Sequence, residues 1–188
     1  SIGGKDSMSG TFNDIDVPPT LVSFAVDVAK IQDVITPELK KAGNKLVWLR
    51  APKDQYDLPD YAGIMDQYEK LHKDMQDGKV VSAYALDRHG IAAAVAKMAF
   101  GNGMGVKIEH NLDPRDFFAP GFGDIILEVP DGKVGELSIT YTVIGEVTAD
   151  GNFSYGNTVI TVDEAENAWK GTCLLYTSPS PRDRSLSR

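Results

Sequence analysis

The order of the apolar segments constrains the fold of this chain more than any other feature of its sequence. Strand-like runs rich in β-branched and aromatic residues cover residues 20–26, 45–50, 79–85, 103–109, 124–129, 141–147 and 158–162. Turn signals such as Asp131-Gly132 and Asp150-Gly151 separate several of them. Because strands and helices neither alternate strictly nor form separate halves, we expect an α+β fold, with a mixed β-sheet covered by at least two helices. The run 20–26 is almost wholly apolar, which predicts a strand buried on both faces.

Two segments have helical periodicity. Asp57-Leu58-Pro59-Asp60 is typical of a helix start, and Asp77-Gly78 of a helix end. Between them one apolar face is expected, formed by Ile64, Met65, Tyr68, Leu71, His72 and Met75. His72 is therefore interpreted as a core residue and not as a ligand. A second helix is expected over residues 91–100. Shorter helices or turns are expected at 33–43, 114–118 and 163–169.

The overall charge and the single cysteine exclude several classes of protein. The 188 residues are enough for one domain with a real core, and no apolar run approaches the roughly 20 residues that span a bilayer. The net charge of −8, with no cluster of Lys and Arg, argues against nucleic acid as a partner. Cys173 is alone, which excludes a disulfide framework and fits a reducing, cytoplasmic setting. The chain does not begin with Met, so we expect a fragment.

The first ten residues carry the most concentrated polar chemistry. Gly3-Gly4 is followed by Lys5, Asp6, Ser7 and Ser9. Glycines let backbone N–H groups approach an anion, Lys5 would add positive charge, and a carboxylate such as Asp6 would suit a hard cation. This is not the P-loop pattern, and a polar loop without any ligand is the alternative interpretation.

A second candidate is the polar turn Asp87-Arg88-His89-Gly90, which follows a strand and precedes an alanine-rich helix. A helix N-terminus in that position would be able to face a phosphate, and Asp87 and His89 are the candidates for chemistry. The alternative is a helix cap with solvated neighbours. His110 has no second His at helical spacing and is interpreted as a surface residue.

Six segments resemble the late part of phosphoribosylformylglycinamidine synthase, the amidotransferase-ligase of the fourth step of purine synthesis. The most specific of them is Gly4-Lys5-Asp6-Ser7-Met8-Ser9. The resemblance spans residues 1–10, 17–26, 82–91, 96–102, 121–128 and 144–147, and hence nearly all of residues 1–170.

The resemblance implies the fold and domain organisation of an ATP-dependent superfamily that includes aminoimidazole ribonucleotide (AIR) synthetase and selenophosphate synthetase. Residues 1–30 would be the end of a first, AIR synthase N-terminal-like domain, with a glycine-rich loop and its last strand. Residues 31–172 would form the C-terminal-like α+β domain. Residues 173–188 resemble translated sequencing-adapter read-through and are set aside, the alternative being a genuine disordered tail.

In such an enzyme, ATP and Mg²⁺ activate an amide of formylglycinamide ribonucleotide, and ammonia from glutamine displaces the phosphate. The resemblance places Gly3, Gly4 and Lys5 at the nucleotide, Ser7 and Ser9 at the substrate, and Asp6 and Asp87 at the metal. Some relatives carry a metal-binding Asn at the position of Lys5, and a Lys cannot ligate Mg²⁺. Residues 1–172 lack the cysteine of a glutaminase, so that domain is expected downstream and the isolated fragment should be inactive.

Alternative functions remain open at this point. The segment would instead be a non-catalytic half that binds a structural nucleotide, or part of a sibling synthetase of the same superfamily. The sequence Arg88-His89-Gly90-Ile91, where most relatives carry a Gly-Gly pair, favours the structural half locally. A free-standing phosphate-binding module is the third possibility, and it requires residues 1–172 to fold alone.

Overall fold

The computed structural model describes residues 2–7, 10–109 and 112–174, and the chain divides into two compact units, residues 1–34 and 35–188. The expected boundary lies near residue 30, four residues before this division. His110 and residues 175–188 of the supposed tail lie outside the described residues. Within the described part of the chain, we find no helix that has both the length and the apolar character needed to cross a membrane.

The first unit consists of paired strands. Strand β1 (Gly3–Ser7) pairs antiparallel with β4 (Thr20–Phe24), and β2 (Gly10–Phe12) pairs antiparallel with β3 (Ile15–Val17). Asn13 between β2 and β3 has a φ of 53°, a left-handed conformation that Asn tolerates in tight turns. A short 3₁₀ helix, η1 (Ile31–Asp33), closes the unit.

The strand expected at residues 20–26 forms, but its predicted burial is wrong. Every residue of β4 is exposed, including Leu21 at 86% and Phe24 at 52%. The physical reason is that a strand is buried on both faces only when a sheet is covered on both sides. Among the residues of this unit that the structure describes, β4 pairs with β1 alone.

The second unit is built on a seven-stranded mixed sheet with the order β11-β10-β7-β9-β5-β8-β6. All neighbours are antiparallel except β10 and β7, which are parallel. The strands are β5 (Lys45–Leu49), β6 (Ser82–Ala85), β7 (Gly105–Ile108), β8 (Ile125–Val129), β9 (Thr142–Thr148), β10 (Asn152–Tyr155) and β11 (Thr158–Thr161). Strand β10 is absent from the sequence-based assignment, since its residues Asn152 to Tyr155 follow directly on a turn.

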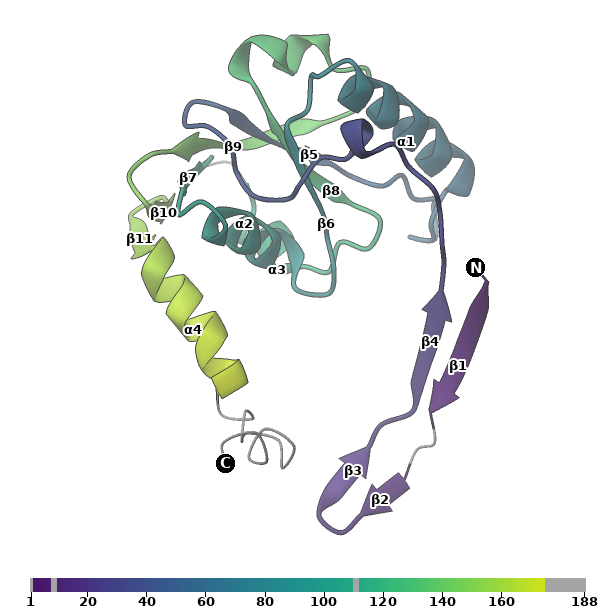
Figure 1. Cartoon of the computed structure of the whole chain (residues 1–188). Helices are drawn as coiled ribbons and strands as arrows, with labels where there is room; N and C mark the ends of the chain where they lie inside the picture. The colour runs from purple at the N-terminus through teal and green to yellow at the C-terminus, as the bar shows by residue number, and fades with distance from the viewer. Residues whose placement is uncertain (1, 8–9, 110–111, 175–188) are drawn as a thin grey trace, which may run out of the picture. The chain divides into compact units, whose positions relative to one another are not determined.

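Helices cover both faces of this sheet, as expected (Figure 1). They are α1 (Tyr61–Gln76), α2 (Gly90–Phe100), α3 (Pro114–Phe118) and α4 (Val162–Leu174), with a 3₁₀ segment η2 at Asp131–Glu136. Alternate residues of β5 belong to different cores: Leu46 and Trp48 pack with α2, whereas Val47 and Leu49 pack with Leu71 of α1. This period of two is what a strand between two helical layers requires.

The predicted apolar face of α1 is partly wrong. The helix begins directly after the predicted start segment, and Asp60 is its N-cap, since its carboxylate accepts a hydrogen bond from Gly63 N. His72 and Met65, however, are exposed, while Asp74 is fully buried. Periodicity alone favoured His72 over Asp74 because Ser138, which donates two hydrogen bonds to Asp74, lies 64 residues later in the chain.

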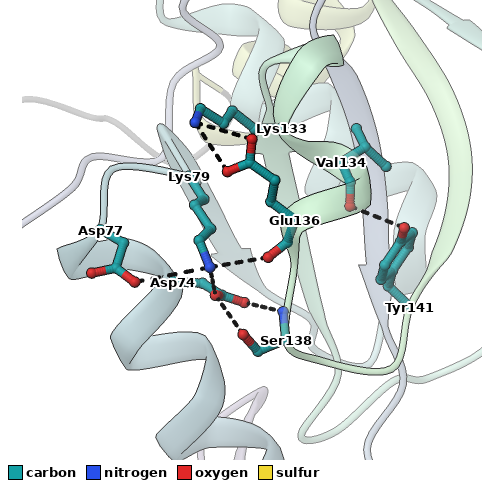
Figure 2. A network of polar contacts seen from close by, with 8 residues as sticks. All are labelled: Asp74, Asp77, Lys79, Lys133, Val134, Glu136, Ser138 and Tyr141. Carbon is teal, nitrogen blue, oxygen red and sulfur yellow. Dashed lines mark hydrogen bonds and ion pairs between the residues drawn. The ribbon is translucent and has the colours of Figure 1, made fainter.

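Asp74 is the centre of a buried polar network that fastens the η2 segment to α1 (Figure 2). Its carboxylate lies 2.7 Å from Lys79 Nζ and accepts hydrogen bonds from Ser138 N at 2.7 Å and Ser138 Oγ at 3.0 Å. Lys79 also donates to the carbonyl oxygen of Glu136. Burial by itself raises the pKa of Asp74, but Lys79 and Ser138 together outweigh it and hold that pKa below its ordinary value.

The C-terminal helix is longer than expected. It was expected to end near Trp169, but α4 continues to Leu174 and so includes Cys173, which the sequence analysis assigned to the tail. The ring of Trp169 lies 5.6 Å from that of Phe100 at the end of α2. This contact joins the last helix to the second one.

Candidate functional site

Within the opening decapeptide, residues Gly3–Ser7 form strand β1 where a glycine-rich loop was expected. Gly3 to Ser7 pair in register with Phe24 to Thr20, and a Cβ on Gly4 would lie 3.2 Å from the carbonyl oxygen of Val22. The close backbone approach at Gly4 is therefore to its own partner strand. Ser9 lies outside the described residues, and for Lys5, Asp6 and Ser7 the structure describes the backbone. Their binding roles stay predictions.

Asp87 lies in the turn between β6 and α2, where it holds the following residues in place. Its carboxylate accepts a hydrogen bond from His89 N at 2.7 Å, and the same oxygen lies 3.0 Å from His89 Nδ1. Lys97 Nζ approaches the other oxygen at 3.6 Å. The hydrogen bond from the His89 backbone is the largest influence on the Asp87 carboxyl, and with the imidazole and Lys97 it lowers the pKa.

The capping alternative for this turn is met in part. Asp87 braces the turn, while His89 occupies the N-cap position of α2 and makes no side-chain capping bond there. Arg88 Nε donates to His89 Nε2 at 3.2 Å, and His89 Nδ1 lies within hydrogen-bond distance of Asp87. Among the residues that the structure describes, no three His, Cys, Asp or Glu side chains gather as a metal site.

Gly90 explains how the turn packs against the rest of the unit. Its φ is 69°, and a Cβ there would lie 2.5 Å from the carbonyl oxygen of Ala119 and 3.0 Å from that of Phe117. Only glycine fits this combination of a left-handed backbone and a close backbone approach. The Asp87 turn is thereby held against the segment that follows α3.

The Asp87 turn and the Gly121-Phe122-Gly123-Asp124 turn, both within segments that carry the resemblance, lie side by side. Gly121 N donates to the Asp87 carbonyl at 3.1 Å, and Leu86 N donates to the Asp124 carbonyl at 2.9 Å. Strand register explains the meeting, because Leu49 of β5 and Ala85 of β6 both pair with Ile125 of β8. The residues that follow β5 and β6 and the residues that precede β8 therefore lie together at one edge of the sheet, where these strands end or begin.

Asp124 is a buried carboxylate at that edge, and the sequence analysis did not single it out. It is 6% exposed, accepts a 2.9 Å hydrogen bond from Trp48 Nε1, and accepts a 2.8 Å hydrogen bond from Ala51 N. Burial raises the pKa of Asp124, and these two donors only partly oppose it. Its signal in the sequence was an acid directly before an apolar strand, a pattern that turns also produce.

A polar pocket of about 570 Å³ opens in front of Asp124. Its charged lining residues are Arg50, Lys53, Asp57, Asp116 and Asp124, with Trp48, Pro59, Pro120, Gly121 and Phe122 as the remaining wall. A second cavity, of about 370 Å³, lies among α2, α3, β10, β11 and α4 and is lined almost wholly by apolar side chains. Of these two, the charged pocket is better suited to a polar ligand.

Comparisons with known proteins bear out the resemblance and the fold class. No family model matches the chain. It is 24% identical over 202 residues to phosphoribosylformylglycinamidine synthase subunit PurL of Lactobacillus acidophilus, covering 93% of this chain and 27% of that protein. It is also 24% identical over 206 residues to the same subunit of Methanothermobacter thermautotrophicus, covering 94% and 29%. The chain thus spans less than a third of these curated relatives.

The solved structures agree on the fold. PurL of Thermotoga maritima complexed with ATP superposes with a TM-score of 0.59 at 14% identity, over 73% of this chain and 28% of that one. The same protein complexed with FGAR gives a TM-score of 0.59 at 12% identity, over 72% and 30%. The α+β fold with a mixed, helix-covered sheet is confirmed.

Proposed function

We propose that this chain is a segment of a PurL-type phosphoribosylformylglycinamidine synthase, an ATP-dependent ligase of purine biosynthesis. The intact enzyme would convert formylglycinamide ribonucleotide and glutamine to formylglycinamidine ribonucleotide. The observation that carries the proposal is the similarity to curated PurL subunits along 93% of the chain. PurL of T. maritima has been solved with ATP and with FGAR, which abbreviates formylglycinamide ribonucleotide. These structures support ATP and formylglycinamide ribonucleotide as the ligands.

The reaction explains why such an enzyme needs phosphate-binding groups. An amide oxygen is a poor leaving group, and transfer of a phosphoryl group to it creates a good one that ammonia can displace. Fixed donors and metal ions must stabilise the negative charge that develops during the transfer. The ammonia would come from a glutaminase outside this chain, since residues 1–172 contain no cysteine nucleophile.

Within this scheme we assign the opening decapeptide to the phosphorylated ligands. Gly3 and Gly4 would let the nucleotide approach the backbone closely and Lys5 would offer its positive charge to the nucleotide, while Ser7 and Ser9 would donate hydroxyls on the substrate side. Pairing of β1 with β4 supports the assignment because it fixes the backbone of Gly3 to Ser7 before any ligand arrives.

Magnesium is the cofactor that the proposal implies, and Asp87 fits it only as a single ligand. Mg²⁺ is usually held by one or two carboxylates together with substrate phosphates and waters. Asp87 offers one half-exposed carboxylate, but His89 and Lys97 already approach it. We assign Asp6 and Asp87 as candidate ligands, and bound Mg²⁺ would supply charge neutralisation for the transferred phosphate.

Substitution in the intact protein that carries this chain tests the assignment. Lys5→Ala and Ser7→Ala should each lower kcat/KM for formylglycinamide ribonucleotide by about tenfold or more, which corresponds to at least about 1.4 kcal/mol of lost transition-state binding. The unfolding midpoint should stay unchanged. Lys70→Ala is the matched control, because Lys70 forms only an exposed ion pair with Asp66 on α1.

The alternative, a half that binds a structural nucleotide, has one observation in its favour. The carboxylate of Asp87 is engaged by His89 and Lys97, within a turn whose Arg88-His89 departs from the pattern of most relatives. In the same experiment this alternative predicts that Lys5→Ala lowers the free energy of unfolding while turnover is retained. If neither turnover nor stability changes, the decapeptide has no role in binding.

A further inference from the structure

We propose that the pocket in front of Asp124 is a binding site for a small organic molecule that carries a carboxylate or phosphate group, with Arg50 as its anion-binding residue. The inference does not rest on the proposed function, because every residue of the pocket lies in the second unit and none belongs to the decapeptide.

Arg50 is positioned in advance by its neighbours. Its guanidinium carbon lies 4.0 Å from the centre of the Trp48 ring, an arrangement that is attractive for a cation and that limits the rotation of a flexible side chain. The indole is itself held by the 2.9 Å hydrogen bond to Asp124, whose second oxygen is held by Ala51 N. A buried carboxylate therefore supports the indole, which supports the guanidinium.

The Arg50 guanidinium already forms an ion pair with a carboxylate of the chain. Asp116 Oδ2 accepts a hydrogen bond from Arg50 Nη2 at 3.1 Å, and both side chains are half exposed. An exposed ion pair of this kind is worth no more than about 1 kcal/mol. A ligand oxyanion that makes the bidentate contact favoured by guanidinium would therefore displace Asp116 at small cost.

A second cation faces the same pocket, and it too is paired with a carboxylate. Lys53 lines the pocket and is paired with Asp57 at 2.8 Å, again with largely exposed side chains. Both oxygens of Asp124 accept hydrogen bonds from Trp48 and Ala51, and its charge acts on Arg50 and Lys53 from a longer distance. The two cations are thus held by exchangeable partners, Asp116 and Asp57, and the ligand would compete with these.

The size of the pocket indicates that the ligand has a body beyond its anionic group. A single oxyanion would fill a small fraction of about 570 Å³. Pro59, Pro120 and Phe122 form a less polar part of the wall, which suits the carbon skeleton of such a molecule. Phe122 is 70% exposed, as expected for a wall that a ligand would cover.

Anion titration of the 188-residue chain tests the site. The chain has two tryptophans, and Trp169 does not line the pocket, so Trp169→Phe leaves Trp48 as the only indole reporter. Inorganic phosphate and acetate are the probes, each titrated against chloride at equal ionic strength to remove the effect of screening. The expected result is a saturable change of Trp48 fluorescence. The tighter of the two probes identifies phosphate or carboxylate as the ligand group, and no saturable response to either overturns the proposal.

Three variants locate the response. Arg50→Gln should weaken probe binding at least tenfold, whereas Asp116→Asn should tighten it by about two- to fivefold, the worth of the exposed ion pair that it removes. Arg115→Gln is the matched control, since Arg115 lies beside Asp116 on α3, is paired with Asp113 and does not line the pocket. Equal loss of binding in Arg115→Gln and Arg50→Gln, or no effect of Arg50→Gln, overturns the proposal. Cooperative unfolding of each variant confirms that the comparison is between folded proteins.

Discussion

The indole nitrogen of Trp48 donates a 2.9 Å hydrogen bond to the carboxylate of Asp124, although the two residues are 76 positions apart in the chain. Trp48 lies on β5 and Asp124 directly precedes β8, and antiparallel pairing of these strands brings the two residues together. The bond is buried, so the indole N–H and the carboxylate need each other as hydrogen-bond partners. It also anchors the wall of the charged pocket.

Removing either partner should therefore be costly, and removing both should cost less than the sum. We expect Asp124→Ala to lower the free energy of unfolding by about 1–3 kcal/mol, because Trp48 Nε1 and Ala51 N would be left buried without an acceptor. Trp48→Phe with Asp124→Ala completes a double-mutant cycle, measured by urea unfolding, with a coupling energy of about 1–2 kcal/mol. A coupling energy near zero would show that the bond contributes nothing to stability.

The buried ion pair of Asp74 and Lys79 should shape the acid stability of the protein. The pKa of Asp74 is held below its ordinary value of 3.8, so in that acid range the folded chain binds fewer protons at this site than the unfolded chain. Its contribution is complete above pH 3.8 and is lost as the pH falls through the lowered pKa. Asp74→Asn should therefore flatten the fall of unfolding free energy between about pH 5 and pH 2.

Asp77→Asn is the control for this pH experiment. Asp77 lies 3.8 Å from the same Lys79 Nζ, but its side chain is 48% exposed. It should leave both the acid slope and the stability at pH 7 nearly unchanged, since exposed pairs contribute little. Asp74→Asn, by contrast, should cost about 1–3 kcal/mol at pH 7, because the buried carboxylate that pairs with Lys79 and accepts hydrogen bonds from Ser138 is lost. Identical acid slopes in wild type and Asp74→Asn would contradict the account.

Gly90 should tolerate no side chain. Gly90→Ala places a Cβ 2.5 Å from a backbone carbonyl oxygen at a φ of 69°, so we expect a loss of more than about 2 kcal/mol in thermal or urea unfolding. Gly78→Ala separates the two causes. Gly78 has nearly the same φ, 68°, with open space around the added Cβ, so its loss should be about 1 kcal/mol. Equal losses at both positions would show that the close approach to Ala119 does not matter.

The buried carboxylate of Glu128 should hold the loop before β5 in place. It is fully buried, and its two oxygens accept hydrogen bonds from Lys40 N, Lys41 N and Asn44 Nδ2. Glu128→Gln turns one acceptor into a donor, so at least one of these bonds is lost, at a cost of about 1–3 kcal/mol. Amide hydrogen exchange should accelerate at Lys40 and Lys41 more than elsewhere.

The control for the Glu128 experiment is Glu146→Gln, which alters a carboxylate of the same sheet. Glu146 lies on β9, is 42% exposed and pairs with Lys45 at the surface. Its substitution should leave exchange at Lys40 and Lys41 unchanged and shift stability by at most about 1 kcal/mol. Uniform acceleration of exchange in both variants would indicate a general loss of stability and not a local effect of Glu128 on the loop before β5.

The sequence by itself determined most of the elements and the fold class, because these depend on local periodicity and turn chemistry. The apolar runs at residues 45–49 and 125–129, the helix start at residues 57–60 and the stop at Gly78 are all readable within a few residues, and each appears in the structure. The resemblance was readable too, since it rests on short motifs such as Gly4 to Ser9.

Tertiary structure decided which polar residues are buried and what meets at the candidate site. Asp74, Asp124 and Glu128 are buried acids that any hydropathy pattern places outside, because most of their donors lie far along the chain. Ser138 is 64 positions from Asp74, Trp48 is 76 positions from Asp124, and the donors to Glu128 are 84–88 positions away. The exposure of β4 and of His72 was missed for the same reason: burial depends on which surfaces pack against each other. Short-range pattern fixes what a segment becomes, whereas strand register, set by the whole sheet, fixes its neighbours.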